Sequence, residues 1–261
     1  MHAVPALRHA LAFVLAASCT LAAAQAQKAP TAYEPAVGQE GKDVVWVPTS
    51  DALVNKMLDM AKVTPRDFVM DLGSGDGRTV IAAAKRGARA MGIEYNPDMV
   101  ALSQKNAEKA GVSKSATFMK ADLFQTDFSK ATVITMFLLP EINLKLRPKI
   151  LALKPGTRVV SNSFTMGEWQ ADESATLGDE TGCSSWCTAL LWIVPARAAG
   201  RYTIPDGELV LQQEFQMLSG TLRATGGPVA VDGRVRGEEV SFKAGGKQYR
   251  GRITNGKLEL K

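Results

Sequence analysis

Histidine is almost absent from this sequence of 261 residues, which has only two, at positions 2 and 9. Both lie in a leader of 26 residues, where an arginine is followed by an alanine-rich apolar stretch and a small-x-small triplet ending at Ala26. This pattern predicts a secretory signal peptide cleaved near Ala26. The predicted mature chain has no histidine, which excludes Ser-His-Asp and Cys-His catalysis and histidine-ligated metals. We therefore expect no metal site.

Cysteine is also scarce, with three in the chain. Cys19 lies in the leader and offers a lipoprotein alternative, but Ala16 replaces the usual leucine of that signal and apolar residues continue beyond the cysteine. The apolar part is too short and too rich in alanine to favour a transmembrane helix. We therefore expect an exported, periplasmic protein with no transmembrane segment in the mature chain. Cys183 and Cys187 remain; in an oxidising compartment they suggest a disulfide, and two buried thiols are the alternative.

Neither sign of charge dominates, with 31 Lys and Arg against 26 Asp and Glu and a formal net charge of +5. Loss of Arg8 with the leader leaves +4, and the remaining basic residues are spread along the chain. Such a distribution does not make a nucleic-acid footprint, so we do not expect nucleic acid as a partner. A hydrophobic content of 46% and this length suit one large domain, or a domain with a small appendage.

The chain is organised around residues 68–94. An apolar run ends in an acid, a glycine turn follows, and then come a helical stretch and a second strand ending in another acid. The residues at these positions are Asp71, Gly73, Ser74, Gly75, Asp76, Gly77 and Glu94. This is the β-loop-α-β unit of a doubly wound nucleotide-binding sheet. The sixth-position glycine of a dinucleotide fingerprint is missing, because Arg78 stands there, and two flanking carboxylates repel a pyrophosphate. They suit a ligand that carries an ammonium and a sulfonium.

The loop resembles the first motif of the class I, seven-β-strand, Rossmann-like methyltransferases, which use S-adenosylmethionine (SAM), and the resemblance covers roughly residues 45–195. It implies an α/β fold with a doubly wound, mostly parallel sheet, and SAM as the cofactor. In that family, the acid after strand one meets the methionine ammonium and the acid after strand two takes the ribose hydroxyls. The next residue packs on the adenine, and an acid after strand three receives the adenine amino group beside a backbone amide. The matching residues here are Asp71, Glu94, Tyr95, Asp122 and Leu123.

The segment after strand four bears on the methyl acceptor. Methyltransferases of planar nitrogens often carry Asn/Asp-Pro-Pro-Tyr/Phe there, whereas this chain has Phe137, Leu138, Leu139 and Pro140. With the upstream Val-Pro-Thr that ends at Thr49, this segment looks like the small mitochondrial-type lysine methyltransferases and their bacterial relatives. The resemblance implies a protein lysine as acceptor and places Thr49 over the cofactor; an ordinary helix entry is the alternative for Thr49.

Glu141 is the nearest sequence candidate for orienting an acceptor. A first-turn helix residue that favours the helix dipole is the alternative.

The domain organisation follows from changes in composition. We expect a signal peptide over 1–26, a flexible leader over 27–42, the methyltransferase domain over 43–198 with a surface loop at 167–182, and a small antiparallel β unit of four or five strands over 199–261.

SAM is a cytoplasmic cofactor, so export and methyl transfer are in tension. An exported scaffold that kept the fold without turnover, and a small-molecule methyltransferase, are therefore alternative hypotheses. The oligomeric state is not readable from the sequence.

Overall fold

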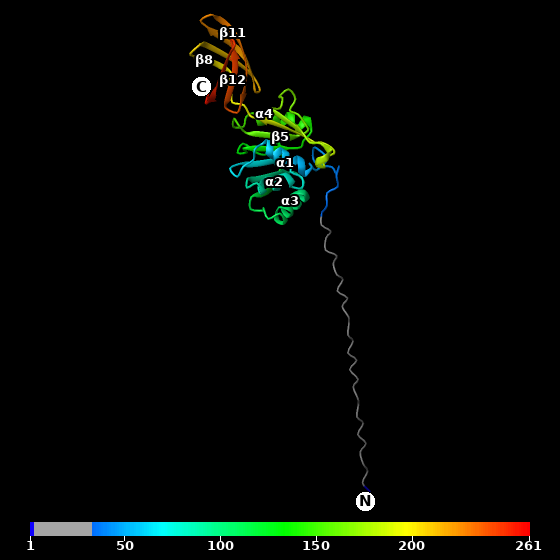
Figure 1. Cartoon of the computed structure of the whole chain (residues 1–261). Coiled ribbons are helices and arrows are strands. Elements are labelled where there is room, and N and C mark those ends of the chain that lie inside the picture. The colour runs from blue at the N-terminus through cyan, green and yellow to red at the C-terminus, as the bar shows by residue number, and fades with distance from the viewer. Residues whose placement is uncertain (3–32) are drawn as a thin grey trace. The chain divides into compact units, whose positions relative to one another are not determined.

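Two seven-stranded sheets account for most of the structure, a computed structural model that describes residues 1–2 and 33–261 (Figure 1). The predicted signal peptide, apart from its first two residues, lies outside the described residues, and so do Cys19 and Ala26. In the part of the chain that is described, no helix is long and apolar enough to cross a membrane.

The first sheet has the strand order β3-β2-β1-β4-β5-β7-β6. Its strands are β1 (Phe68–Leu72), β2 (Arg89–Glu94), β3 (Ala116–Lys120), β4 (Val133–Met136), β5 (Arg158–Asn162), β6 (Glu173–Thr176) and β7 (Thr188–Ile193). Strands β1 to β5 pair in parallel, and β7 runs antiparallel to both β5 and β6. The prediction of a doubly wound, mostly parallel sheet is confirmed.

Helices cover both faces of this sheet. They are α1 (Asp51–Met60), α2 (Arg78–Lys85), α3 (Pro97–Lys109) and α4 (Pro140–Leu151). The apolar side chains of α1, α2 and α3 share one buried cluster with the sheet, whereas those of α4 belong to a second cluster. Because both faces are covered, a central strand such as β4 is buried at every position and reads as an apolar run. The first turns are fixed by side-chain caps, with Ser50 Oγ accepting from Leu53 N and Asn96 Oδ1 accepting from Asp98 N.

The second sheet is an antiparallel meander in which every strand pairs with its neighbour in sequence. Its strands are β8 (Gly200–Ile204), β9 (Gly207–Glu214), β10 (Met217–Ala224), β11 (Gly227–Arg236), β12 (Glu239–Ala244), β13 (Lys247–Thr254) and β14 (Lys257–Leu260). The expected antiparallel unit is confirmed, but the expected four or five strands are wrong because there are seven. Charged strands such as β14 have only two apolar residues, and their pairing decides their structure.

The segment predicted as a surface loop over 167–182 contains β6 and a 3₁₀ turn, Asp179–Thr181. The prediction is wrong because pairing with β7 orders this polar segment. Residues just before β6 also contact the second sheet. Trp169 stacks on Phe215 with ring centroids 6.2 Å apart, and the buried carboxylate of Asp172 pairs with Arg234.

Candidate functional site

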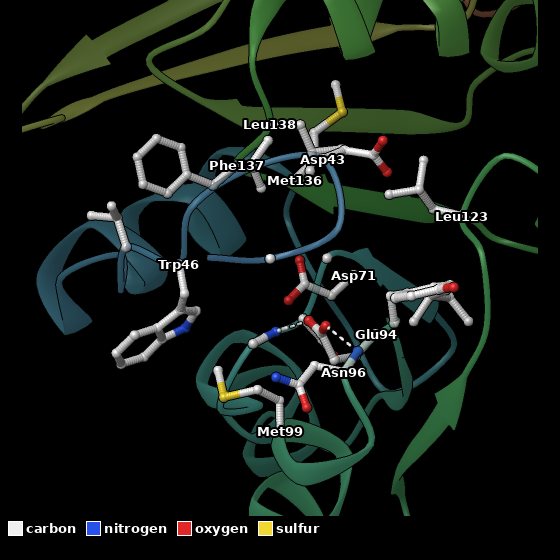
Figure 2. Close-up of a pocket in the computed structure, with 18 of the residues that line it drawn as sticks. Asp43, Trp46, Asp71, Glu94, Asn96, Met99, Leu123, Met136, Phe137 and Leu138 are labelled. Atoms are coloured by element: carbon white, nitrogen blue, oxygen red, sulfur yellow. Dashed lines mark hydrogen bonds between the residues drawn. The ribbon is translucent and has the colours of Figure 1, made fainter. Parts of the chain in front are cut away.

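A pocket lies at the carboxyl ends of β1, β2 and β4, where parallel sheets bind their ligands. Figure 2 shows the carboxylates of Asp71 and Glu94 pointing into the same space from neighbouring strands. The chain segment that carries Asp43 and Trp46 crosses over them. The strand order therefore brings together the two acids that the sequence places 23 residues apart.

The glycine turn after β1 has a backbone that side chains would disturb. Gly73, Gly75 and Gly77 all have positive φ, at 81°, 53° and 84°. A Cβ on Gly75 would lie 2.6 Å from Trp46 Nε1, and one on Gly77 would lie 2.8 Å from the Phe118 ring. The turn therefore needs glycine for its conformation and also for the close approach of its neighbours.

Glu94 braces this turn. Its Oε2 accepts a hydrogen bond from Gly75 N at 3.0 Å, and its Oε1 accepts one from Asn96 N at 2.9 Å (dashed lines, Figure 2). A carboxylate has about four lone-pair sites, so two remain for a ligand that donates hydrogen bonds. Two adjacent ribose hydroxyls are such a ligand, which is the role that the sequence predicts for Glu94.

Asp71 is buried, with 6% of its surface exposed. Burial raises the pKa of Asp71 to about 7, and the nearby charges of Glu94 and Asp76 add to the rise, while the hydrogen bond from Thr135 opposes it. Thr135 Oγ1 donates to Asp71 Oδ1 at 2.7 Å. A carboxylate held this way gains from a cation beside it, because an opposite charge favours its ionised form.

Asp76 and Thr49 are tied to each other through Arg78. The guanidinium donates to both carboxylate oxygens of Asp76, at 3.0 Å and 2.6 Å, and to the carbonyl oxygen of Thr49 at 2.8 Å. Asp76 raises the pKa of Arg78 through this pairing. Both predicted cofactor residues line the pocket, and the structure gives them a part in anchoring the entry to α1 against the glycine turn.

The remaining predicted cofactor residues gather after β2 and β3. Tyr95, Asp122 and Leu123 all line the pocket. Asp122 Oδ2 accepts a hydrogen bond from Lys42 Nζ at 2.8 Å, and Lys42 Nζ lies 5.1 Å from the centroid of the Tyr95 ring. The hydrogen bond from Lys42 lowers the pKa of Asp122.

Lys42 belongs to a segment that sequence reasoning missed, residues 39–49, here named the strap. Every residue of the strap lines the pocket, and hydrogen bonds between Gly38 and Trp46 and between Trp46 and Gln39 hold it closed on itself. The interpretation of 27–42 as a flexible leader did not anticipate this placement of 39–42. The strap has no regular secondary structure, so no periodic pattern could have revealed it.

The predicted acceptor-side residues divide into two groups. Phe137 and Leu138 line the pocket beyond the end of β4. Pro140 and Glu141 form the first turn of α4, where Glu141 is exposed, and neither is among the pocket-lining residues. Phe164 and Trp186 line the same end of the pocket and were missed, since they come from the connections after β5 and before β7.

The residues present fit SAM as a ligand. Asp71 and Glu94 are the carboxylates that its ammonium and ribose hydroxyls require, and the turn between them is free of side chains at its glycines. Ser74 Oγ lines the pocket and is a buried hydroxyl with no hydrogen-bond partner among the described residues. An unsatisfied buried group of this kind favours a polar ligand.

Comparisons with known proteins agree with this geometry. Residues 71–173 match the family described as the ANTKMT methyltransferase domain. The chain is 45% identical over 139 residues to a protein-lysine N-methyltransferase of Saccharolobus islandicus, a match that covers 52% of this chain and 86% of the relative. It is 36% identical over 177 residues to an ATP synthase lysine N-methyltransferase of Mus musculus, covering 67% of this chain and 68% of the relative.

A solved structure also matches. It is described as an RNA methyltransferase from Salinibacter ruber in complex with S-adenosyl-L-homocysteine, and it is 45% identical to this chain with a TM-score of 0.54. The match covers 58% of this chain and 95% of that chain. With the strand order, the glycine turn and the paired acids, these likenesses establish that the chain belongs to the class I SAM-dependent methyltransferases of the ANTKMT domain family.

Proposed function

We propose that this enzyme transfers the methyl group of SAM to the side-chain amine of a protein lysine. The observation that carries the proposal is the match to a protein-lysine N-methyltransferase over 86% of that relative's length. The apolar and aromatic acceptor end of the pocket supports it, because a lysine presents a four-carbon stem before its amine. The missing Asn/Asp-Pro-Pro-Tyr/Phe segment argues against a planar nitrogen.

The residues of the pocket divide the work. When bound, SAM supplies a methyl group on a positively charged sulfur. Asp71 holds the ammonium end, Glu94 holds the ribose, and Asp122 with Tyr95 receives the adenine. Methyl transfer is an in-line displacement, so the chain contributes chiefly alignment and exclusion of water. The strap supplies part of that exclusion by covering the pocket.

The acceptor amine must lose its proton before it attacks. Glu141 is exposed and not among the residues that line the pocket, so we propose bulk water as the proton acceptor. Glu141→Gln is then expected to leave turnover within about twofold of the parent, as an exposed helix residue does.

Titration calorimetry with SAM and with S-adenosylhomocysteine tests the cofactor site first. Micromolar binding is expected, and Glu94→Ala is the matched control. Transfer is then followed by mass spectrometry on protein extracts and on total RNA in parallel. Methylated lysine supports the proposal, methylated RNA favours the acceptor class in the description of the Salinibacter ruber protein, and cofactor binding without transfer to protein, RNA or small molecules favours the non-catalytic scaffold.

We also propose that the protein is exported, with cleavage near Ala26. The support is the leader's composition together with the disulfide between Cys183 and Cys187, since such bonds persist in oxidising compartments. Cell fractionation with mass spectrometry of the mature N-terminus tests this. A chain that retains Met1 in the cytoplasm would exclude export.

A further inference from the structure

Three aromatic rings meet at the acceptor end of the pocket. Phe137 and Phe164 stack with centroids 5.7 Å apart and 20° between their planes. Trp186 tilts against both, 6.2 Å from Phe137 and 5.1 Å from Phe164, with interplanar angles of 57° and 46°. We name these three residues the aromatic corner. All three line the pocket that contains Asp71 and Glu94.

Trp186 is an unusual residue to leave in solvent. It is 49% exposed, although its ring packs on two others. Aromatic residues bury large areas and contribute most when covered. The exposed portion of Trp186, at the mouth of a pocket, is therefore surface that a ligand can cover.

The backbone around the corner is held in conformations that side chains rarely adopt. Trp186 has φ 57°, and Ser163, directly before Phe164, also has φ 57°. Such conformations persist only where the surroundings enforce them, and they cluster at functional sites. Two of the three rings therefore project from constrained positions.

A disulfide enforces the position of Trp186. Cys183 and Cys187 are joined with their Cα atoms 5.8 Å apart, so the bond closes a five-residue loop that contains the tryptophan. Cys183 is buried at 2% exposure, and the Cys187 carbonyl oxygen accepts from Leu177 N at 2.9 Å. One end of the loop is packed into the protein and the other is bonded to the chain after β6, so the ring between them is fixed relative to the pocket.

We propose that the aromatic corner binds the alkylammonium side chain of the acceptor, and that the disulfide positions Trp186 for this contact. The inference deepens the proposed function and rests on it for the identity of the acceptor. Electron-rich ring faces attract a cation, and recognition of methylated ammonium groups by clustered aromatic residues is the established use of this attraction. The stacked phenylalanines offer apolar surface for the stem, and the tilted indole adds a third face.

The test uses a probe that separates charge from shape. The purified mature chain, saturated with S-adenosylhomocysteine, is titrated with N-acetyl-trimethyllysine methylamide and with its neutral isostere, which has a tert-butyl group in place of trimethylammonium. We expect the cationic probe to bind more tightly than the isostere. Trp186→Ala is expected to weaken the cationic probe by about 3- to 30-fold, with unchanged affinity for S-adenosylhomocysteine. Ser184→Ala, in the same loop, is the matched control and is expected to change neither affinity.

Removal of the disulfide supplies a second arm. The double variant Cys183→Ser/Cys187→Ser is expected to weaken the cationic probe in the same direction as Trp186→Ala. Adding that pair of substitutions to Trp186→Ala is expected to cause no further loss, because the disulfide acts through the tryptophan. Equal binding of the two probes, or an unchanged affinity in Trp186→Ala, would overturn the inference.

The outcome also separates this inference from the proposed function. A wild-type chain that binds the cationic probe through Trp186 and methylates no lysine leaves the corner as an alkylammonium site and excludes the proposed acceptor. A chain that methylates lysine with the same KM in wild type and Trp186→Ala keeps the proposed function and excludes the role of the corner.

Discussion

At the cofactor end of the pocket the polar side chains follow strands that adjoin in the sheet, whereas at the acceptor end three rings come from separate connections. Asp71 and Glu94 end β1 and β2, which pair directly in parallel register. The aromatic corner combines residues after β4, after β5 and before β7, and it includes a disulfide loop. The cofactor end is thus specified by local motifs, and the acceptor end by long-range packing, which leaves the acceptor end freer to differ between relatives.

The sharpest way to separate the two ends is Glu94→Ala. This change removes the acceptor of the Gly75 and Asn96 N–H bonds and the expected contact with the ribose hydroxyls. Hydrogen bonds to a charged group are worth about 1.5–3 kcal/mol each, so SAM affinity is expected to fall by about 100- to 1,000-fold in calorimetry. Binding of the trimethyllysine probe to the cofactor-free chain is expected to stay within about twofold of the parent. A parallel loss of both affinities would show that the two ends are one unit.

A pair of glycine substitutions tests whether close packing defines the cofactor end. Gly77→Ala is strained at φ 84° and would also meet the Phe118 ring at 2.8 Å and Ser103 Cβ at 2.9 Å. We expect it to lower the free energy of unfolding by about 2–4 kcal/mol, from backbone strain and overpacking together. Gly111→Ala is the control, because its φ is 72° and nothing lies within 4 Å of the added Cβ. Only the strain of about 1–2 kcal/mol is expected there, measured by urea denaturation.

The pH dependence of binding is expected to differ between the ends. The pKa of Asp71 is raised to about 7, chiefly by burial, so below that pH its carboxyl group is protonated in the cofactor-free protein. The cofactor's ammonium favours the ionised form, so binding releases a proton, and SAM affinity should rise by up to about tenfold per pH unit from pH 5 to 7 before levelling off.

Asp71→Asn should abolish this slope, and Thr135→Val should move the plateau to higher pH because it removes a donor to the carboxylate. The trimethyllysine probe carries a permanent charge and the rings do not titrate, so its affinity should stay flat over the same range. Calorimetry in buffers of different ionisation enthalpy measures the proton release directly, and its absence would contradict the assignment of Asp71.

The smallest effects are expected where the second sheet supports the hairpin that carries Trp186. Arg234 pairs with Asp172, whose side chain is 1% exposed, so Arg234→Gln leaves a buried carboxylate with only its bond from Ile193 N. A loss of about 1–2 kcal/mol is expected, below the usual figure for a buried pair because Arg234 is itself 44% exposed. Arg236 pairs with Glu173 where both are exposed, and Arg236→Gln should cost under about 0.5 kcal/mol. Equal losses in thermal unfolding would show that burial is not the deciding factor.

The sequence predicted most of the first sheet because buried parallel strands are apolar runs bounded by turn residues. The predictions for Asp71, Glu94 and Asp122 place all three in one pocket, since each ends or follows a strand and such residues meet at the same edge. The strap and β6 were missed because neither has a periodic apolar pattern. The second sheet was recognised as antiparallel, but its strand number was not, since charged strands and turns look alike in composition.

By itself, the sequence determined the strand-turn-helix unit, the glycine positions and the acids at the strand ends, because these depend on contacts between residues close in the chain. Tertiary structure alone decided that Lys42 bonds Asp122, that Thr135 donates to Asp71, and that Trp186 meets Phe137 and Phe164. These contacts join segments 22 to 80 residues apart. They form only when the sheet order has brought the segments together, and no local pattern in the chain records that order.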